Sequence, residues 1–275
     1  GDKSTATITI TINGHTDGLP SITPNDENGN NVGGQITVYE SGLSTGSNAS
    51  AASESASGTI QINAGDGLSS INIGGQTFSL SQLQSLSSSN PSAAINVAGG
   101  TIVLNGFTAN SSVGGIPTSG SLSYTYTLNN AQTHSAVGND GLLLSGIPLS
   151  VTDAGGVTTT GSLVVQVIDD VPTAVNDSNS IPVGSLAVVT GNVVSNDTKG
   201  ADGARVTTVK ADTANGLDVT IDPVGNYTVV GKYGTLTIHS DGSYSYARNA
   251  GSAGGVSDVF TYTLTDGDND TSTAQ

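Results

Sequence analysis

The chain has 275 residues, which is enough for two domains of ordinary size, each with a core of its own. Its 22 acidic residues outnumber 6 basic ones, and the formal net charge of -16 argues against nucleic acid or an anionic membrane surface as a partner and favours cations. The absence of cysteine excludes a disulfide framework and a thiolate zinc site.

The composition predicts an all-β protein. Glycine is abundant at 38 residues, and serine and threonine are frequent, whereas residues that favour helices are scarce. No apolar run approaches the roughly 18 residues that a membrane span requires, so we expect no membrane insertion. Because the sequence opens abruptly at Gly1, without a leader, we expect it to be a piece of a longer exported chain in which bound metal replaces disulfides.

The first predicted strand covers residues 5–12, where threonine alternates with alanine or isoleucine. Such alternation is typical of a half-buried strand. The segment 266–274 can be aligned with the start of the chain, so that Asp270 falls on Asp2. This internal repeat predicts that residues 1–19 are the last strand of a preceding unit, or an N-terminal strand followed by a joint.

Residues 20–170 are predicted to form a first β-sandwich. Short alternating strands are separated by turns rich in glycine, asparagine and serine, a pattern typical of this fold. The strands are expected near residues 60–62, 71–73, 102–104, 122–128 and 163–167. Within residues 79–86 leucine recurs every three positions, and Ser79 with Gln82 can form a capping box, which predicts one short helix. Residues 44–57 lack periodicity and are predicted to be an exposed loop.

A joint is predicted where the first unit ends, in residues 168–177. Asp169 and Asp170 close an apolar strand, and Asn176 and Asp177 follow after a proline. Because no Lys or Arg lies among them, these groups repel one another unless a cation compensates, and their oxygen atoms suit calcium. We therefore predict a Ca²⁺-stiffened hinge between two β-domains. An equivalent joint at the amino end would contain Asp2, Asp17 and Asp26.

Residues 171–275 are predicted to form a second β-sandwich. Two alternating strands flank the Asp241-Gly242 turn, a strong hairpin signal. The strand at residues 259–264 leads into an aspartate cluster with D-x-D-x-D spacing. This spacing resembles the start of an EF-hand loop but lacks its glycine and late glutamate, and the alternative is a solvated acidic turn. Three carboxylates packed beside a strand end favour a metal site, which would comprise Asp266, Asp268 and Asp270.

Two strings of the second unit, at residues 234–246 and 258–268, resemble the VCBS or cadherin-like repeat of large bacterial surface proteins. The first unit resembles the longer repeat of type I-secreted (RTX) giant adhesins through the segments 38–43, 64–68, 123–128, 134–135 and 168–174. This resemblance implies tandem immunoglobulin-like modules that are exported unfolded and fold outside the cell in calcium. It also implies that the joint carboxylates bind the ion, with Glu40 as a helper.

The predicted fold is therefore all-β, with two tandem immunoglobulin-like sandwiches and one short helix in the first. The predicted function is that of a monomeric extender, secreted to the bacterial cell surface. Calcium and neighbouring repeats would align the chain, so that a distal tip meets cell-surface ligands in adhesion and biofilm formation. The alternative is a sugar- or peptide-binding module that uses loops 44–57 or 110–119, although the chain has no tryptophan to stack on a sugar.

No enzyme is predicted, because no catalytic constellation is present. The Gly-x-Ser-x-Gly match around Ser44 precedes a loop rich in serine and alanine instead of joining a strand to a helix, so we interpret it as accidental. His15, His134 and His239 lie far apart, without a second ligand at metal spacing, and are predicted to be satisfied or exposed. Asp140 precedes a glycine and is interpreted as an ordinary turn residue.

Overall fold

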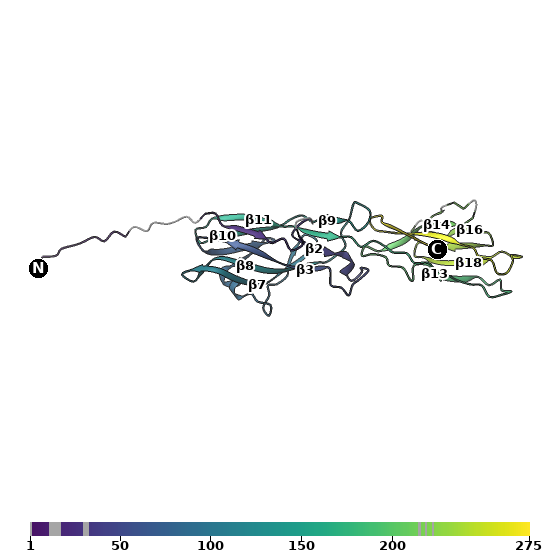
Figure 1. Cartoon of the computed structure of the whole chain (residues 1–275), viewed down its shortest axis with the longest axis horizontal. Helices are drawn as coiled ribbons and strands as arrows, with labels where there is room; N and C mark the ends of the chain where they lie inside the picture. The colour runs from purple at the N-terminus through teal and green to yellow at the C-terminus, as the bar shows by residue number, and fades with distance from the viewer. Residues whose placement is uncertain (1, 11–17, 30–32, 214–215, 218, 222) are drawn as a thin grey trace.

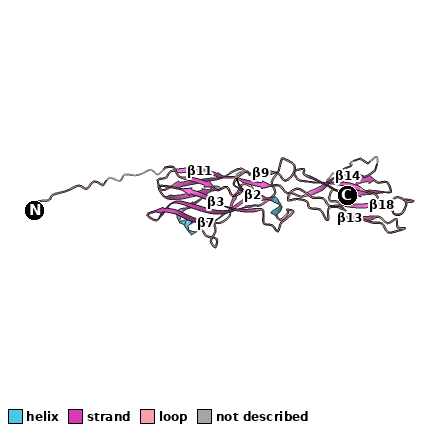
Figure 2. Cartoon of the chain, viewed as in Figure 1, coloured by secondary structure: helices cyan, strands magenta, loops and turns pink. Residues whose placement is uncertain are grey.

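The computed structural model describes residues 2–10, 18–29, 33–213, 216–217, 219–221 and 223–275. Two β-rich units lie end to end along one long axis, and the segment 2–10 extends away from the first unit (Figure 1). Strands dominate both units, and the helical segments of the described residues lie in the first (Figure 2). The prediction of an all-β fold with a short helix in the first unit is confirmed.

The first unit contains three sheets. The largest is antiparallel and has the strand order β1 (Ser21–Pro24), β3 (Ser55–Asn63), β8 (Ile116–Leu128), β7 (Gly100–Val113) and β6 (Ile95–Val97). A second antiparallel sheet has the order β11 (Thr158–Leu163), β10 (Ile147–Asp153), β4 (Leu68–Ile73) and β5 (Gln76–Ser79). The third has the order β2 (Ile36–Tyr39), β12 (Val165–Ile168) and β9 (Gly141–Leu143), and its β2 and β12 are parallel.

Alternation along the strands buries one face of each sheet. In β8 the side chains of Leu122, Tyr124, Tyr126 and Leu128 are at most 1 % exposed, and the residues between them are partly exposed. The buried faces of the sheets share one apolar core, made mainly of isoleucine, leucine and valine. The period of two in the sequence therefore identifies the inward side chains correctly.

The capping box identifies the helix correctly. α1 covers Leu80–Ser85, and the Ser79 side chain accepts a hydrogen bond from the backbone N of Gln82. In return the Gln82 side chain accepts one from Ser79 N at 2.8 Å. Leu83 is the fully buried residue of this helix and fixes it against the core.

The prediction of an exposed loop over residues 44–57 is wrong in part. A 3₁₀ turn, η1 (Glu40–Gly42), leads into a series of turns, and β3 already begins at Ser55. Thr45 and Ser47 donate hydrogen bonds to Ala201 and Asp170, beyond the last strand of the first unit. Small hydroxyl side chains make such contacts without any periodicity in the sequence, so the pattern gave no sign of them.

The second unit packs two four-stranded antiparallel sheets over its own apolar core. One has the order β13 (Val189–Asn192), β18 (Ser243–Arg248), β17 (Gly234–Ile238) and β16 (Tyr227–Val230). The other has the order β15 (Val219–Thr220), β14 (Ala204–Ala211), β19 (Phe260–Asp266) and β20 (Thr271–Ala274). The predicted hairpin is present as β17 and β18, and Gly242 adopts φ +84° in its turn, a conformation that favours glycine.

The prediction of a half-buried strand over residues 5–12 is wrong for the part that the structure describes. Residues 2–10 are extended without strand pairing, and the side chains of Ile8 and Ile10 are 86 % and 80 % exposed. An alternating segment becomes a strand only when a neighbouring strand accepts its hydrogen bonds. Among the described residues this segment has no such neighbour.

Candidate metal centre

The two units meet where the strand ends of both converge. β2 and β12 are parallel, with Ile168 opposite Tyr39, so the residues that follow the two strands emerge side by side. These residues are Glu40 and Asp169, and both are buried. The pairing of two strands that are distant in sequence thus explains why Glu40 lies at the joint.

The second unit contributes a tight turn between β19 and β20. Asp266 ends β19, and its Oδ1 accepts a hydrogen bond from Asp270 N at 2.7 Å. Asn269 has φ +82°, a left-handed conformation that asparagine tolerates better than most residues. A Cβ on Gly267 would lie 2.2 Å from Asp202 Oδ2, so glycine at this position lets the Asp202 carboxylate approach the turn.

Hydrogen bonds join this turn to the first-unit loop that precedes β9. Asp268 Oδ2 accepts a hydrogen bond from His134 N at 3.1 Å. Asp270 Oδ1 accepts one from Gly138 N at 2.7 Å. The carboxylates of the second unit therefore already receive backbone donors from the first.

Three groups of possible metal ligands lie at the joint. In each group, one ligand atom from every residue lies within 4.8 Å of the others. The groups are Glu40, His134 and Asp169; Asp169, Asp268 and Asp270; and Asp202, Asp266 and Asp268. Because Asp169 and Asp268 each belong to two groups, the seven residues form one continuous set across the joint, which we call the joint cluster.

Several carboxylate oxygens of the joint cluster are buried without a hydrogen-bond partner. They are Oδ2 of Asp169, Asp266 and Asp270, and Oδ1 of Asp268. In the described part of the chain, no Lys or Arg nitrogen lies within ion-pair distance of them. A buried carboxylate oxygen without a partner is costly, and oxygen donors at this spacing fit a hard divalent cation such as Ca²⁺.

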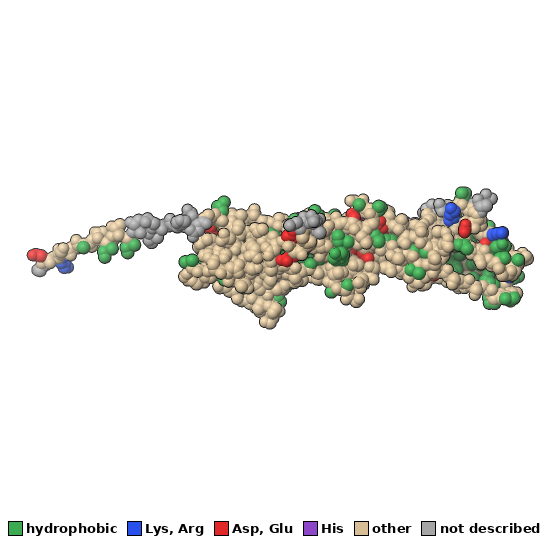
Figure 3. All heavy atoms as spheres, in the orientation of Figure 1, with side chains coloured by type: hydrophobic (Ala, Val, Ile, Leu, Met, Phe, Trp, Pro, Cys, Tyr) green, Lys and Arg blue, Asp and Glu red, His purple; other side chains and the backbone are tan. Residues whose placement is uncertain are grey.

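The outer surface contrasts with the joint. Charged side chains are sparse over the face visible in Figure 3, where uncharged polar residues and backbone dominate. Among the described residues, the buried polar or charged side chains lie at the joint, with Asp153 as the exception. They are Glu40, His134, Asp169, Asp170, Asp266 and Asp270. All buried acidic side chains of the described residues except Asp153 therefore lie at the joint.

Burial raises the pKa of two joint carboxyl groups into the neutral range. The pKa of Asp169 rises to about 7, mainly through burial, and the nearby Asp270 carboxyl group adds to this rise. The pKa of Asp266 also rises to about 7 through burial and through the charges of Asp202 and Asp268. Without a cation, such groups retain protons near neutral pH, and a bound cation would replace those protons.

The structure brings together five of the predicted ligands: Glu40, Asp169, Asp266, Asp268 and Asp270. All five lie at or near a strand end; the four aspartates were predicted from this feature of the sequence, whereas Glu40 was suggested only by the family resemblance. Their side chains come from both units, as a joint requires.

Asp170 lies at the joint but outside the three groups of possible ligands. Its two carboxylate oxygens accept hydrogen bonds from Ser47, at 2.7 Å from the backbone N and at 2.5 Å from the hydroxyl. The carboxylate therefore holds the loop after η1, in place of the predicted metal contact.

The structure separates Asn176 and Asp177 from the joint cluster, contrary to the prediction. The Asn176 side chain accepts a hydrogen bond from Gln275 N at 2.9 Å. The Asp177 carboxyl group lies near Asp197 and Tyr262, inside the second unit. Proximity in the sequence suggested a common site, but the chain leaves the joint between Asp170 and these residues.

Of the residues predicted for an amino-terminal joint, the two that the structure describes, Asp2 and Asp26, are not gathered into a site. Asp2 lies in the exposed extended segment. Asp26 stabilises a turn, because its Oδ1 accepts hydrogen bonds from the backbone N of Asn28 and Gly29. Asp17 lies outside the described residues.

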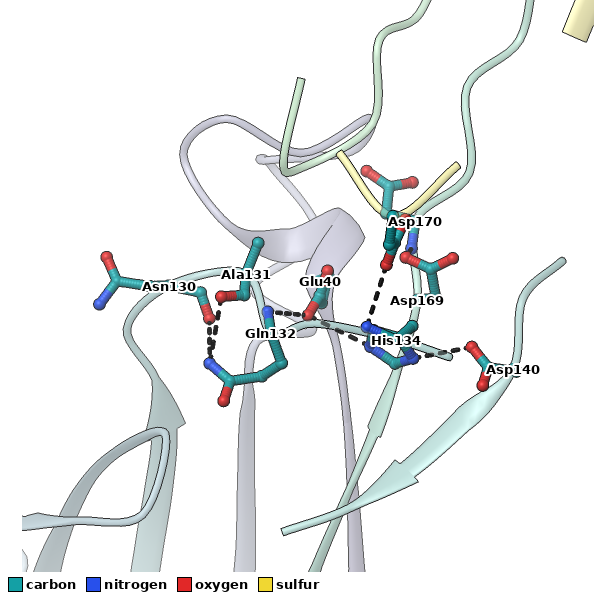
Figure 4. Close-up of polar contacts among 9 residues, drawn as sticks. Glu40, Asn130, Ala131, Gln132, His134, Asp140, Asp169 and Asp170 are labelled. Atoms are coloured by element: carbon teal, nitrogen blue, oxygen red, sulfur yellow. Dashed lines mark hydrogen bonds and ion pairs between the residues drawn. The ribbon is translucent and has the colours of Figure 1, made fainter. Parts of the chain in front are cut away.

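His134, Asp140 and Asp202 were missed as site residues. His134 is 3 % exposed and lies between Glu40 and Asp140, close to Asp169 (Figure 4). Burial alone lowers the pKa of His134, but the hydrogen bond with Asp140 and the charges of Glu40 and Asp169 raise it above its usual value. Asp140 and Asp202 each precede a glycine, a pattern that ordinary turns share, so the sequence alone did not single them out.

Residues 169–275 match the family model of a bacterial Ig domain. No curated protein matches the chain at a significant level. The match confirms an immunoglobulin-like fold for the second unit, and domains of this family are structural modules that are usually extracellular or surface-exposed. None of the helices in the described residues is long and apolar enough to span a membrane. The closer resemblance to VCBS repeats and to RTX adhesin extenders stays a prediction.

Proposed function

We propose that the two units are extender modules of a secreted bacterial adhesin, and that Ca²⁺ at the joint cluster holds neighbouring modules in line. The observation that supports this most is the convergence of unpartnered, buried carboxylate oxygens from both sides of the joint. A structural, surface-exposed module of the bacterial Ig class is consistent with such a role.

Two of the three groups have only oxygen ligands and therefore suit calcium. Asp169, Asp268 and Asp270 would hold one ion, and Asp202, Asp266 and Asp268 a second. Calcium takes six to eight oxygen ligands, so water and backbone carbonyls would complete each shell. Asp268 belongs to both groups and also accepts a hydrogen bond from the first unit, so its neutralisation would affect both ion sites and this contact across the joint.

The proposal explains how the joint could be loose in one compartment and stiff in another. Extracellular calcium modules typically have dissociation constants of about 10⁻⁴ to 10⁻³ M, far above the calcium concentration inside a cell. Without the ion, the clustered carboxylates repel one another and weaken the hydrogen bonds between the turn and the loop. With calcium bound, the aligned modules would hold a distal tip away from the cell, where it would contact cell-surface ligands during adhesion and biofilm formation.

The test compares the shape of the chain in calcium and in chelator. Small-angle X-ray scattering in saturating Ca²⁺ should give a longer maximum dimension and a narrower distribution of shapes than in EGTA. The exchange Asp268→Asn should give the chelator profile even in calcium, whereas the same exchange at the exposed Asp212 should not. Identical scattering in both conditions would exclude calcium as the element that aligns the units.

A ligand-binding module remains the second hypothesis, and the structure weakens the case for one of the two loops assigned to it, residues 44–57. Loop residues Thr45 and Ser47 are engaged at the joint. The stretch 110–119 forms the tip of the β7–β8 hairpin. A glycan array with calcium-dependent hits would favour the ligand-binding role over the extender.

A further inference from the structure

We infer that Glu40, His134 and Asp169 form a site for a transition-metal ion such as Zn²⁺, separate in its chemistry from the oxygen-only groups beside it. The inference does not rest on calcium binding at the joint, although Asp169 also belongs to one of the proposed calcium groups. It rests on a buried imidazole nitrogen without a hydrogen-bond partner that faces two buried carboxylates.

The ring orientation of His134 is fixed by a contact with Asp140 on the side of Nδ1. Its Nδ1 lies 2.8 Å from Asp140 Oδ1, and because an ionised carboxylate only accepts hydrogen bonds, Nδ1 carries a proton; in the neutral ring Nε2 is then the nitrogen with a free lone pair. Histidines that bind metals usually donate their other ring N–H to a carboxylate in this way, which fixes the tautomer and makes the ligating nitrogen more basic. Asp140 therefore acts as a positioning residue.

Nε2 of His134 faces the Glu40 carboxylate, with which it forms an ion pair when the ring is protonated, but it makes no hydrogen bond. It lies 3.4 Å from Glu40 Oε1, longer than the roughly 2.7 to 2.9 Å of a charge-assisted hydrogen bond. The His134 side chain is 0 % exposed, and Nε2 has no hydrogen-bond partner. A metal ion bound between these two atoms would replace the proton on Nε2, and their spacing fits two ligands that face a common ion.

The same distance suits a zinc site. With bonds of about 2.0 to 2.1 Å, two ligands of a tetrahedral zinc ion lie roughly 3.3 to 3.4 Å apart. One ligand atom from each of Glu40, His134 and Asp169 lies within 4.8 Å of the others, so a small inward movement of Asp169 would complete three corners. Solvent can take the fourth.

The nitrogen donor decides which ion is preferred. A six-coordinate calcium ion could accept a similar spacing, but calcium takes oxygen ligands, whereas imidazole suits zinc, copper and nickel. The oxygen-only groups in the same cluster lack this nitrogen. Two classes of cation would therefore bind side by side at one joint.

Glu40 is held in place before any ion binds. It is 1 % exposed, and its Oε1 accepts a hydrogen bond from Gln132 N at 2.6 Å. Gln132 and His134 belong to the same loop, so one hydrogen bond fixes the distance between the two ligands that come from different parts of the chain. A zinc ion would clamp this loop to the end of β2.

The experiment measures zinc binding by equilibrium dialysis in saturating calcium, with Zn²⁺ alone as the added metal. One zinc ion per chain is expected, and His134→Gln should abolish this binding, whereas His239→Gln serves as the matched control and should retain it. Asp140→Ala should weaken zinc binding about 10- to 100-fold, the usual effect of removing such a positioning group. Co²⁺ in place of Zn²⁺ should give visible absorption bands that are absent from His134→Gln.

A second measurement covers the case in which His134→Gln does not fold. In the unaltered protein, zinc should shift the side-chain Nε2 resonance of His134 and leave that of His239 unchanged. Displacement of zinc by calcium, unchanged zinc binding in folded His134→Gln, or an unshifted His134 resonance would overturn the inference. Zinc binding at His134 without any effect of calcium on melting would instead uphold the inference and remove the proposed function.

Discussion

Removal of calcium is expected to lower the melting temperature of the second unit by about 10 to 20 °C. One site at a calcium concentration of 100 times its dissociation constant contributes about 2.7 kcal/mol to the free energy of unfolding. For a domain of about 100 residues, 1 kcal/mol corresponds to about 4 to 8 °C. Four of the five residues in the two oxygen-only groups belong to the second unit, and only Asp169 lies at the end of the first, so the loss should fall mainly on the second unit.

The change in melting temperature on removal of calcium should increase with pH. The pKa values of Asp169 and Asp266 are raised to about 7 in the folded chain, well above those of the unfolded chain. In chelator, the stability that their protonation contributes is complete below about pH 4 and is lost as the pH rises through about 7. Calcium must displace these protons, so its own contribution grows over the same interval. The difference in melting temperature between calcium and EGTA should therefore widen from about pH 5 to about pH 8.

Differential scanning calorimetry of the whole chain separates these expectations, because the two units have separate cores and should melt in distinguishable transitions. The transition of the second unit should move with calcium, and that of the first should move much less. Equal shifts of both transitions would indicate a general effect of ionic strength. No shift at any pH would refute the assignment of the buried carboxylates to a calcium site.

Three further predictions address single contacts. Asp268→Asn should remove most of the calcium-dependent shift in calorimetry, because Asp268 belongs to both oxygen-only groups, and Asp212→Asn should retain it. Ser47→Ala removes the hydroxyl hydrogen bond to the Asp170 carboxylate but keeps the one from the backbone N, and should cost about 1 to 3 kcal/mol at the joint, seen as greater independent tumbling of the units in NMR relaxation with both melting transitions preserved. Leu122→Ala should destabilise the first unit by about 2 to 5 kcal/mol, measured by denaturant titration, and should leave the second unit unchanged.

The parts of the fold that were predicted from sequence depend on local patterns. The inward residues of β8, such as Leu122 and Tyr124, follow from the period of two, and α1 follows from the Ser79 capping box. The prediction of a strand containing Ile8 and Ile10 is wrong because a strand also needs a neighbouring strand, which can be distant in the sequence. The alternating pattern of one segment does not show whether such a neighbour is present.

The site was predicted only as far as its ligands follow strand ends. Asp169 and Asp266 were identified because each closes an apolar strand, whereas His134 lies in a loop whose neighbours are fixed by tertiary structure. The parallel pairing of β2 with β12 brings Glu40 beside Asp169, and no local signal encodes that pairing. The resemblance to adhesin repeats suggested that Glu40 helps to bind the ion, and the parallel pairing of β2 with β12 explains how Glu40 comes to lie at the joint.

The composition of the chain explains why the joint depends on its surroundings. Only six Lys and Arg residues are present, and among the described residues none forms an ion pair with the joint cluster. Apart from the imidazole of His134, the buried carboxylates of Asp169 and Asp270 can therefore be neutralised by protons or by cations from solution. If cations fill the joint cluster as we propose, the angle between the units should depend on their concentration in the surroundings, and the site that we infer at His134 would make the same joint respond to a second ion.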